Sequence, residues 1–273
     1  MKKKVLYGFA GLVLIAALLL ILKGCLYRRK NLNFVYDGAY YWSNNSKQFS
    51  NWYYENSASG HQYYLYLPQK YIHDKDNEEA KLPLIVVFHG SDEKGLAYSK
   101  YGRIFVSEKF QSRIYPEGAA VLVINSRINY FTDPHGTGLL IQNVCFRNKC
   151  IDRKNIIGYG FSQGAKFVVE LCCEWPGLFR GVVSGSGFYQ MNFREIIRAL
   201  PVCFYWATSE DDKGIFEQGS PTGKRLARFC KNSRYVQYQT RHHFYVELQD
   251  KTGRKNRDGS DETFLDWICE VVK

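Results

Sequence analysis

The chain is poor in proline and methionine, with 7 Pro and 2 Met among 273 residues, and it contains no internal repeat or low-complexity tract. These shortages exclude a collagen-like, repetitive or disordered protein, because 45% of the residues are hydrophobic and 16% are aromatic. Such a composition can bury enough apolar surface to offset the entropy lost on folding. The length fits one large domain more simply than two small ones.

Zinc-type cysteine spacing is also missing. The eight cysteines contain no Cys-x-x-Cys pair, and Cys172 and Cys173 are adjacent. We therefore predict neither a metal site nor a cofactor. Cys145 and Cys150 bracket a four-residue polar turn and could form a disulfide in an oxidising compartment, whereas Cys203 and the adjacent pair fit buried reduced thiols equally well.

Acidic residues are absent from the first 30 positions, which carry seven basic ones. The whole chain has 37 Lys and Arg against 26 Asp and Glu, a formal charge of +11, so residues 31–273 hold 30 basic and 26 acidic groups. A nucleic-acid-binding domain is expected to carry a concentrated basic stripe. The segment 251–257 is the nearest candidate, but it is a glycine-containing loop with acidic neighbours, so we predict no nucleic-acid partner.

The basic residues at the start flank an uncharged apolar run over 5–22. Eighteen helical residues span about 27 Å, close to the thickness of a bilayer core. We expect residues 1–30 to be an uncleaved single-pass anchor, with the domain on the extracytoplasmic side. Alternatives are a secreted form, or a lipoprotein attached at Cys25, although Lys23 departs from the usual lipobox.

Alternating strands and helices follow the anchor. Residues 31–60 suggest a linker that becomes an edge strand or hairpin, and residues 61–273 a single domain. Apolar runs predict strands at 62–67, 84–88, 119–125, 155–161, 181–184, 202–207 and 235–240. Segments of helical length lie at 96–114, 138–149, 163–174, 193–200, 224–230 and 261–272. This order predicts an α/β fold, a mostly parallel sheet with helices on both faces.

Ligands of such sheets bind beyond the carboxyl ends of the strands. There, residues 160–164 read Gly-Phe-Ser-Gln-Gly, between a predicted strand and a predicted helix. A Gly-x-Ser-x-Gly sequence alone is weak, but a strand, a tight turn and a helix are what a nucleophile elbow requires. We predict Ser162 to be a nucleophile. The alternative is a serine that caps a helix in a nucleotide-binding sheet.

A serine nucleophile needs a base and a group that orients the base. Glu210, Asp211 and Asp212 follow a predicted strand, and we prefer Asp212, then Asp211, as the acid. His242 and His243 are the two histidines downstream of these carboxylates, so one of them must be the base if the triad is complete; we prefer His243.

Attack on a carbonyl creates an oxyanion that needs hydrogen-bond donors. His89 and Gly90 follow the first buried strand, which is typical of an oxyanion loop, and Ser91 or Asp92 would offer a backbone amide. The second amide would come from Gln163. We expect His89 itself to be structural and the loop over 125–137 to line the substrate cleft.

From residue 61 onward the sequence resembles the α/β-hydrolase superfamily. The matching segments are Tyr-Leu-Tyr-Leu-Pro at 64–68, Leu-Pro-Leu-Ile-Val-Val-Phe-His-Gly at 82–90, Ile-Asp at 151–152, Gly-Tyr-Gly-Phe-Ser-Gln-Gly-Ala at 158–165 and Trp-Pro-Gly-Leu-Phe at 175–179. Within the superfamily it is most similar to polyhydroxybutyrate depolymerase-like and feruloyl or acetylxylan esterase-like proteins. It departs from them where the acid strand lacks His-Gly before its Asp and where no glycines precede the last His.

Together these features predict a membrane-tethered serine hydrolase that cleaves small or polymer-linked carboxylic esters through an acyl-enzyme. Two alternatives remain. A peptidase of the prolyl-oligopeptidase type would use the same triad on an amide, but it normally has a large N-terminal domain. A catalytically silent binding or scaffold protein would keep the fold and lose the triad.

Overall fold

The computed structural model describes seven stretches of the chain, residues 40–43, 52–56, 62–91, 101–114, 117–126, 130–238 and 262–273. The predicted anchor over 1–30 and Cys25 lie outside them. Within these stretches no helix is both long and apolar enough to span a bilayer.

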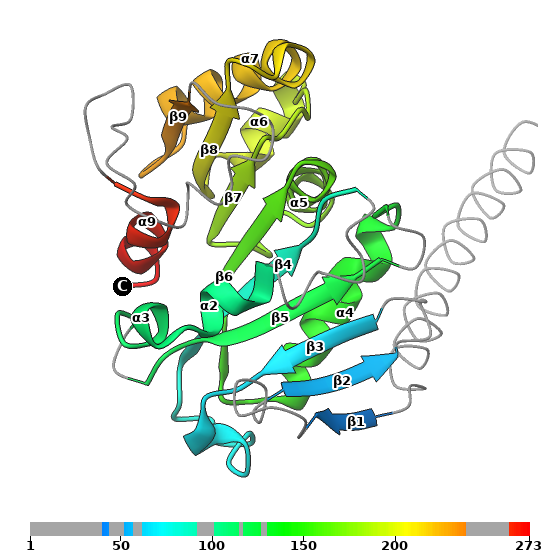
Figure 1. Ribbon diagram of the computed structural model, residues 1–273, viewed down its shortest axis with the longest axis vertical. Coiled ribbons are helices and arrows are strands. Elements are labelled where there is room, and N and C mark those ends of the chain that lie inside the picture. Colours follow the sequence, from blue (N-terminus) through cyan, green and yellow to red (C-terminus); the bar gives the residue numbers. More distant parts are fainter. Residues whose placement is uncertain are drawn as a thin grey trace, which may run out of the picture.

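The described strands form one mixed sheet with the order β1-β2-β3-β5-β4-β6-β7-β8-β9 (Figure 1). Neighbouring strands from β5 through β4 to β9 run parallel, whereas β1, β2, β3 and β5 pair antiparallel. Their bounds are β1 Tyr40–Ser43, β2 Trp52–Asn56, β3 Gln62–Tyr66, β4 Leu82–Phe88, β5 Ala120–Asn125, β6 Ile151–Phe161, β7 Gly181–Gly185, β8 Cys203–Ser209 and β9 Arg234–Tyr238. The predicted α/β architecture with a mostly parallel sheet is confirmed.

Helices cover both faces of this sheet. One core cluster joins Val86 and Phe88 of β4 to α4, α5, α6 and α7. The other joins Ile85 and Val87 to α2, α3 and α9. The helix bounds are η1 Gln69–Tyr71, α2 Arg103–Val106, α3 Glu108–Gln111, α4 Pro134–Arg147, α5 Gln163–Glu174, α6 Phe193–Ala199, α7 Lys213–Phe229 and α9 Phe264–Val271.

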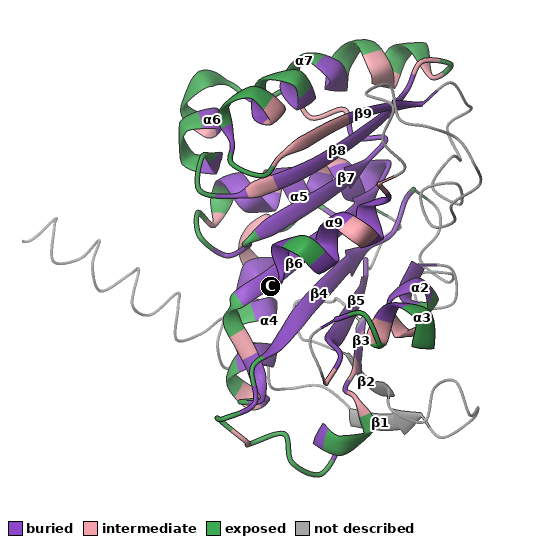
Figure 2. Cartoon of the chain, turned by 90° about the vertical axis from the view of Figure 1, so that its left-hand side faces the viewer, coloured by how far each residue is buried: buried purple, intermediate pink, exposed green. Residues whose placement is uncertain are grey.

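Burial on both faces explains the unbroken apolar sequence of β4. All seven of its residues are buried, so no position alternates toward solvent, as is usual for a central parallel strand (Figure 2). Exposed residues gather instead on the outer surfaces of α6 and α7. Polar side chains that could form a functional site are therefore expected in the turns at the ends of the strands.

Two helix predictions were wrong. Helix α7 begins at Lys213, well before the predicted residue 224, and includes Pro221. Glycine is unfavourable within a helix, so the glycines of this segment argue against one. Close packing nevertheless requires Gly219, because a Cβ there would lie 2.0 Å from the carbonyl oxygen of Gly187. In the predicted helix over 96–114, the described part is two short helices, because Ser107 is extended and caps α3 with its side chain.

Candidate active site

Four parallel strands end in register at one edge of the sheet. Phe161 of β6 pairs with Gly185 of β7, which pairs with Ala207 of β8, and Ala207 pairs with Val236 of β9. The residues that follow these strands therefore share one edge. They include Ser162 and the acidic turn that the sequence singled out, so the fold brings both parts of the predicted site to the same side of the sheet.

Ser162 occupies the turn between β6 and α5. Its φ is 52° and its ψ is −115°, a conformation that side-chain-bearing residues rarely adopt. The Ser162 N–H donates to the carbonyl oxygen of Gly185 over 2.8 Å, and its carbonyl accepts from the N–H of Lys166 over 3.0 Å. Neighbouring backbone thus holds the strained turn from both sides.

The glycines on either side are required by close packing. A Cβ on Gly160 would lie 2.2 Å from the carbonyl oxygen of Gly164. A Cβ on Gly164 would lie 2.4 Å from the carbonyl oxygen of His89 and 2.5 Å from that of Phe88. The first turn of α5 therefore rests directly on the backbone of β6 and on the end of β4, where any larger residue would push it away.

Both the backbone and the side chain of Gln163 contribute to the turn at Ser162. Its N–H lies in the first turn of α5, where helical N–H groups have no partner within the helix. Its side chain forms a reciprocal pair with Phe131, whose N–H donates to Oε1 over 3.3 Å and whose carbonyl accepts from Nε2 over 3.1 Å. This pair ties the chain after β5 to the turn at Ser162.

His89 is buried and holds the loop that follows β4. The N–H of Ser126 donates to Nε2 over 3.1 Å, so the ring proton sits on Nδ1, which donates to the carbonyl of Gly90 over 2.6 Å. The ring also contacts Phe131, with centroids 4.7 Å apart. Ser91, the last described residue after β4, is exposed, and Asp92 lies outside the described residues.

The three carboxylates after β8 have different surroundings. Glu210 is tied to β9: its N–H donates to the carbonyl of Tyr238 over 2.9 Å, and its carboxylate accepts from the Gln237 amide. Asp211 is exposed. Asp212 is half-buried at the start of α7, where its carbonyl accepts from Phe216 while its side chain makes no capping bond.

His242 and His243 lie outside the described residues. The strand that leads to them is described as far as Tyr238, which pairs with Ser209 at the carboxyl end of β8. The chain therefore leaves β9 at the edge that carries Ser162 and Asp212.

Two buried hydroxyls beside the site were missed by the sequence reasoning. Ser184 and Ser186 stand at the end of β7, and neither hydroxyl has a hydrogen-bond partner within the described part of the protein. Ser186 has a φ of 57°, and its N–H donates to the carbonyl of Ala207 over 2.9 Å. The alternation of Gly and Ser over 184–187 was the available signal, but small residues in a strand have many other causes.

Outside this edge, the described cysteines are all free, and Cys145 and Cys150 are not joined. The possible disulfide between them is therefore not formed. Burial raises the pKa of Cys145 to about 12 and that of Cys150 to about 11, so both are protonated at neutral pH. Over the stretches described, no cluster of three His, Cys, Asp or Glu side chains could hold a metal ion.

Comparison with known families finds one match at this site. A model of the phospholipase/carboxylesterase family matches residues 139–249, a segment that includes Ser162, the acidic turn and both histidines. No curated protein sequence matches the chain.

Solved structures share the fold at low sequence identity. A thermostable esterase has a TM-score of 0.54 and 18% identity, over 88% of this chain and 61% of its own. FphF, a fluorophosphonate-binding serine hydrolase from Staphylococcus aureus, has a TM-score of 0.54 and 13% identity over 86% and 99% of the two chains. A ferulic acid esterase has a TM-score of 0.51 and 13% identity over 69% and 90%. These matches confirm the predicted resemblance at the level of the fold.

Proposed function

We propose that this α/β-hydrolase-fold protein is a serine ester hydrolase that works through an acyl-enzyme. The observation that carries the proposal is the conformation of Ser162, a buried serine at positive φ between a central strand and the helix that leaves it. Strain of this kind persists only where the surroundings enforce it, and it concentrates at functional sites. The match to the phospholipase/carboxylesterase family over the same segment supports an ester as the substrate.

In this mechanism Ser162 Oγ attacks the ester carbonyl while a histidine removes its proton. The oxyanion is held by the backbone N–H of Gln163 and by an amide of the loop at Ser91 or Asp92. The start of α5 favours the developing negative charge, because aligned peptide dipoles place partial positive charge there. The same histidine then protonates the departing alcohol, and water releases the acid by the reverse sequence.

Surroundings favour Asp212 as the group that orients the histidine. Glu210 is engaged by Gln237, and Asp211 faces solvent. Asp212 is half-buried and lies at the start of α7, just after the strand whose end shares the edge of the sheet with Ser162. We propose His243 as the base, with His242 as the alternative.

Labelling with a fluorophosphonate probe tests the nucleophile. We expect the full-length protein to label and Ser162→Ala not to label, with the exposed Ser91→Ala as a variant that retains its amide and should still label. Labelling of Ser162→Ala at the wild-type level would contradict the proposal. A folded wild type that never labels would favour a binding or scaffold protein.

The acid is tested by a matched pair of neighbours. Asp212→Asn should lower kcat by about 10³ to 10⁴-fold, the effect of losing the group that orients a triad histidine. Asp211→Asn removes the same charge from the adjacent exposed position and should change kcat by less than about twofold. Equal effects, or the reverse order, would reject Asp212.

Substrate class is tested by comparing p-nitrophenyl esters with p-nitroanilides of the same acids. We expect hydrolysis of the esters alone. Preferred cleavage of the anilides would favour the peptidase alternative.

We also propose that residues 1–30 anchor the enzyme to a membrane. The supporting observation is the apolar run over 5–22 between basic flanks. Extraction with alkaline carbonate should leave the full-length protein in the membrane fraction and release a form without residues 1–30. A full-length protein that is released equally well would contradict the anchor.

A further inference from the structure

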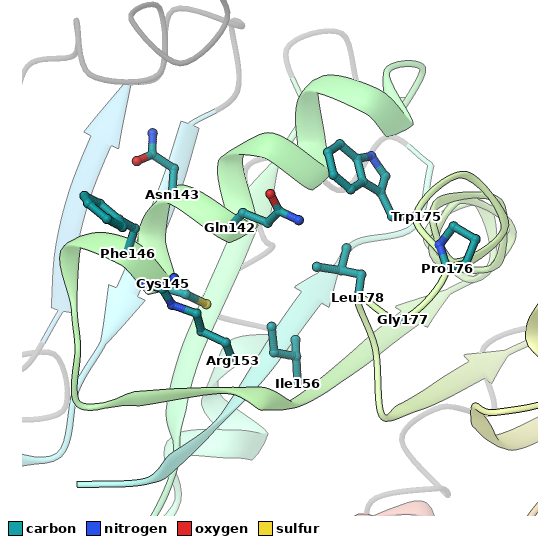
Figure 3. Close-up of a pocket in the computed structure, with 10 residues that line it drawn as sticks. All are labelled: Gln142, Asn143, Cys145, Phe146, Arg153, Ile156, Trp175, Pro176, Gly177 and Leu178. Carbon is teal, nitrogen blue, oxygen red and sulfur yellow. The ribbon is translucent and has the colours of Figure 1, made fainter. Parts of the chain in front are cut away.

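A cavity of about 660 Å³ lies far from the proposed nucleophile. It is bordered by the end of α4, the first half of β6 and the connection from α5 to β7 (Figure 3). Ile156 of β6 lines it, six residues before Ser162, which directly follows this strand; six extended residues span about 20 Å. The volume is in the range of small-molecule sites, yet the proposed chemistry takes place at the other end of the sheet.

The inner walls of this cavity are apolar and firmly held. Ile156, Leu178 and Cys145 are buried residues of the core that line it. Trp175 forms a further wall and packs so closely on α4 that a Cβ at Gly138 would lie 2.2 Å from its Nε1. Its ring also contacts His135, with centroids 5.3 Å apart. A wall fixed in this way costs little ordering entropy when a ligand binds.

The rim of the cavity is positively charged. Arg153 lines it and is exposed, with its guanidinium 5.5 Å from the ring centroid of Phe146. In Figure 3 the Gln142 side chain extends from α4 toward Trp175 and Leu178, whereas the Arg153 side chain extends from β6 toward Cys145 and Phe146. No acidic side chain is among the lining residues within the described stretches.

Two acidic residues outside the lining have other hydrogen-bond partners. Asp152 accepts from the backbone N–H of Lys154 over 2.9 Å. Glu78 pairs with Lys149 over 2.7 Å, and hydrogen bonding to this lysine lowers the pKa of the glutamate, although the charge of Arg153 also contributes to the lowered pKa. An apolar cavity therefore opens beside a cation whose charge no carboxylate of the lining neutralises.

We propose that this cavity binds a monoanionic carboxylate with an aliphatic body. The carboxylate would accept from the guanidinium of Arg153, and the chain would pack against Ile156, Leu178 and Trp175. Arginine suits this role because its planar donors match the two oxygens of a carboxylate. The proposal does not depend on the reaction at Ser162, although a carboxylic acid is also what ester hydrolysis releases.

Calorimetric titration of the full-length protein with octanoate, below its micelle concentration, tests this site. We expect octanoate to bind and the neutral octanamide, which has the same chain, to bind at least tenfold more weakly. Arg153→Gln should weaken octanoate binding about tenfold, the usual value of one charged hydrogen bond, and Arg153→Glu should abolish it. Both changes are at an exposed position, so folding should be preserved.

Lys154→Gln is the matched control, because it removes the neighbouring exposed positive charge from the same strand. Its affinity for octanoate should stay within twofold of wild type. The proposal is overturned if octanoate does not bind, if octanamide binds as tightly, or if Arg153→Gln and Lys154→Gln have the same effect.

Discussion

The hydrogen bonds between Gln163 and Phe131 should stabilise the turn at Ser162. Replacing Gln163 with Ala removes both partners of a buried backbone N–H and carbonyl while leaving the amide of residue 163 in place. Phe131 is buried against Phe88 and Phe167, with ring centroids 5.3 and 5.0 Å away, so water cannot readily replace the lost partners.

Two neutral hydrogen bonds contribute about 1 kcal/mol each, so Gln163→Ala should lower the free energy of unfolding by about 2 kcal/mol. For a chain of this size, that corresponds to a decrease in Tm of about 4 to 8 °C. Gln163→Glu keeps the size of the side chain but sets an oxygen against the Phe131 carbonyl. At neutral pH it should destabilise the protein at least as much, which separates the lost hydrogen bond from lost volume.

Thermal unfolding followed by circular dichroism measures the effect. Gln218→Ala is the control, because Gln218 is an exposed glutamine within α7 and should change Tm by less than about 2 °C. If Gln163→Ala shifts Tm no more than Gln218→Ala does, the two hydrogen bonds do not hold the turn and the reasoning fails.

Three further outcomes follow from the same contacts. Gly164→Ala should prevent stable folding, as judged by soluble yield and circular dichroism, whereas Gly214→Ala, whose Cβ meets no atom within 4 Å, should be tolerated. Burial raises the pKa of Asp266, but hydrogen bonds from Thr263 and Arg113 outweigh it, and the net pKa is lowered. Asp266→Asn should therefore lower the free energy of unfolding by its full amount above about pH 5. This difference from wild type should shrink as the pH falls through about 4 toward the folded pKa, and urea unfolding at several pH values measures it. Iodoacetamide should leave Cys145 unmodified in the native protein at pH 8 and label it in urea, as peptide mass spectrometry would show; rapid native labelling would contradict its burial.

Local sequence predicted the central strands and the strand-turn-helix geometry at Ser162 well, for a physical reason. Strand β4 is buried on both faces and reads as an unbroken apolar run. Gly160 is required by Gly164, four residues away, so part of the motif records a contact that is short in sequence, whereas Gly164 is required by the backbone of Phe88 and His89. The start of α7 could not be predicted in this way. A glycine inside this helix, Gly219, is there because it packs against Gly187, which is distant in sequence.

The sequence by itself determined the α/β class, the position of Ser162 and the group of carboxylates after β8, since each depends on a periodicity or on residue types a few positions apart. Only the tertiary structure showed that the three carboxylates have different surroundings, because Glu210 is engaged by Gln237 from the neighbouring strand, Asp211 is exposed and Asp212 is half-buried. It alone revealed the buried hydroxyls of Ser184 and Ser186 and the cavity beside Arg153. Such features arise where elements that are remote in sequence pack together. The packing decides which buried side chains have no partner, and a local sequence pattern does not show this.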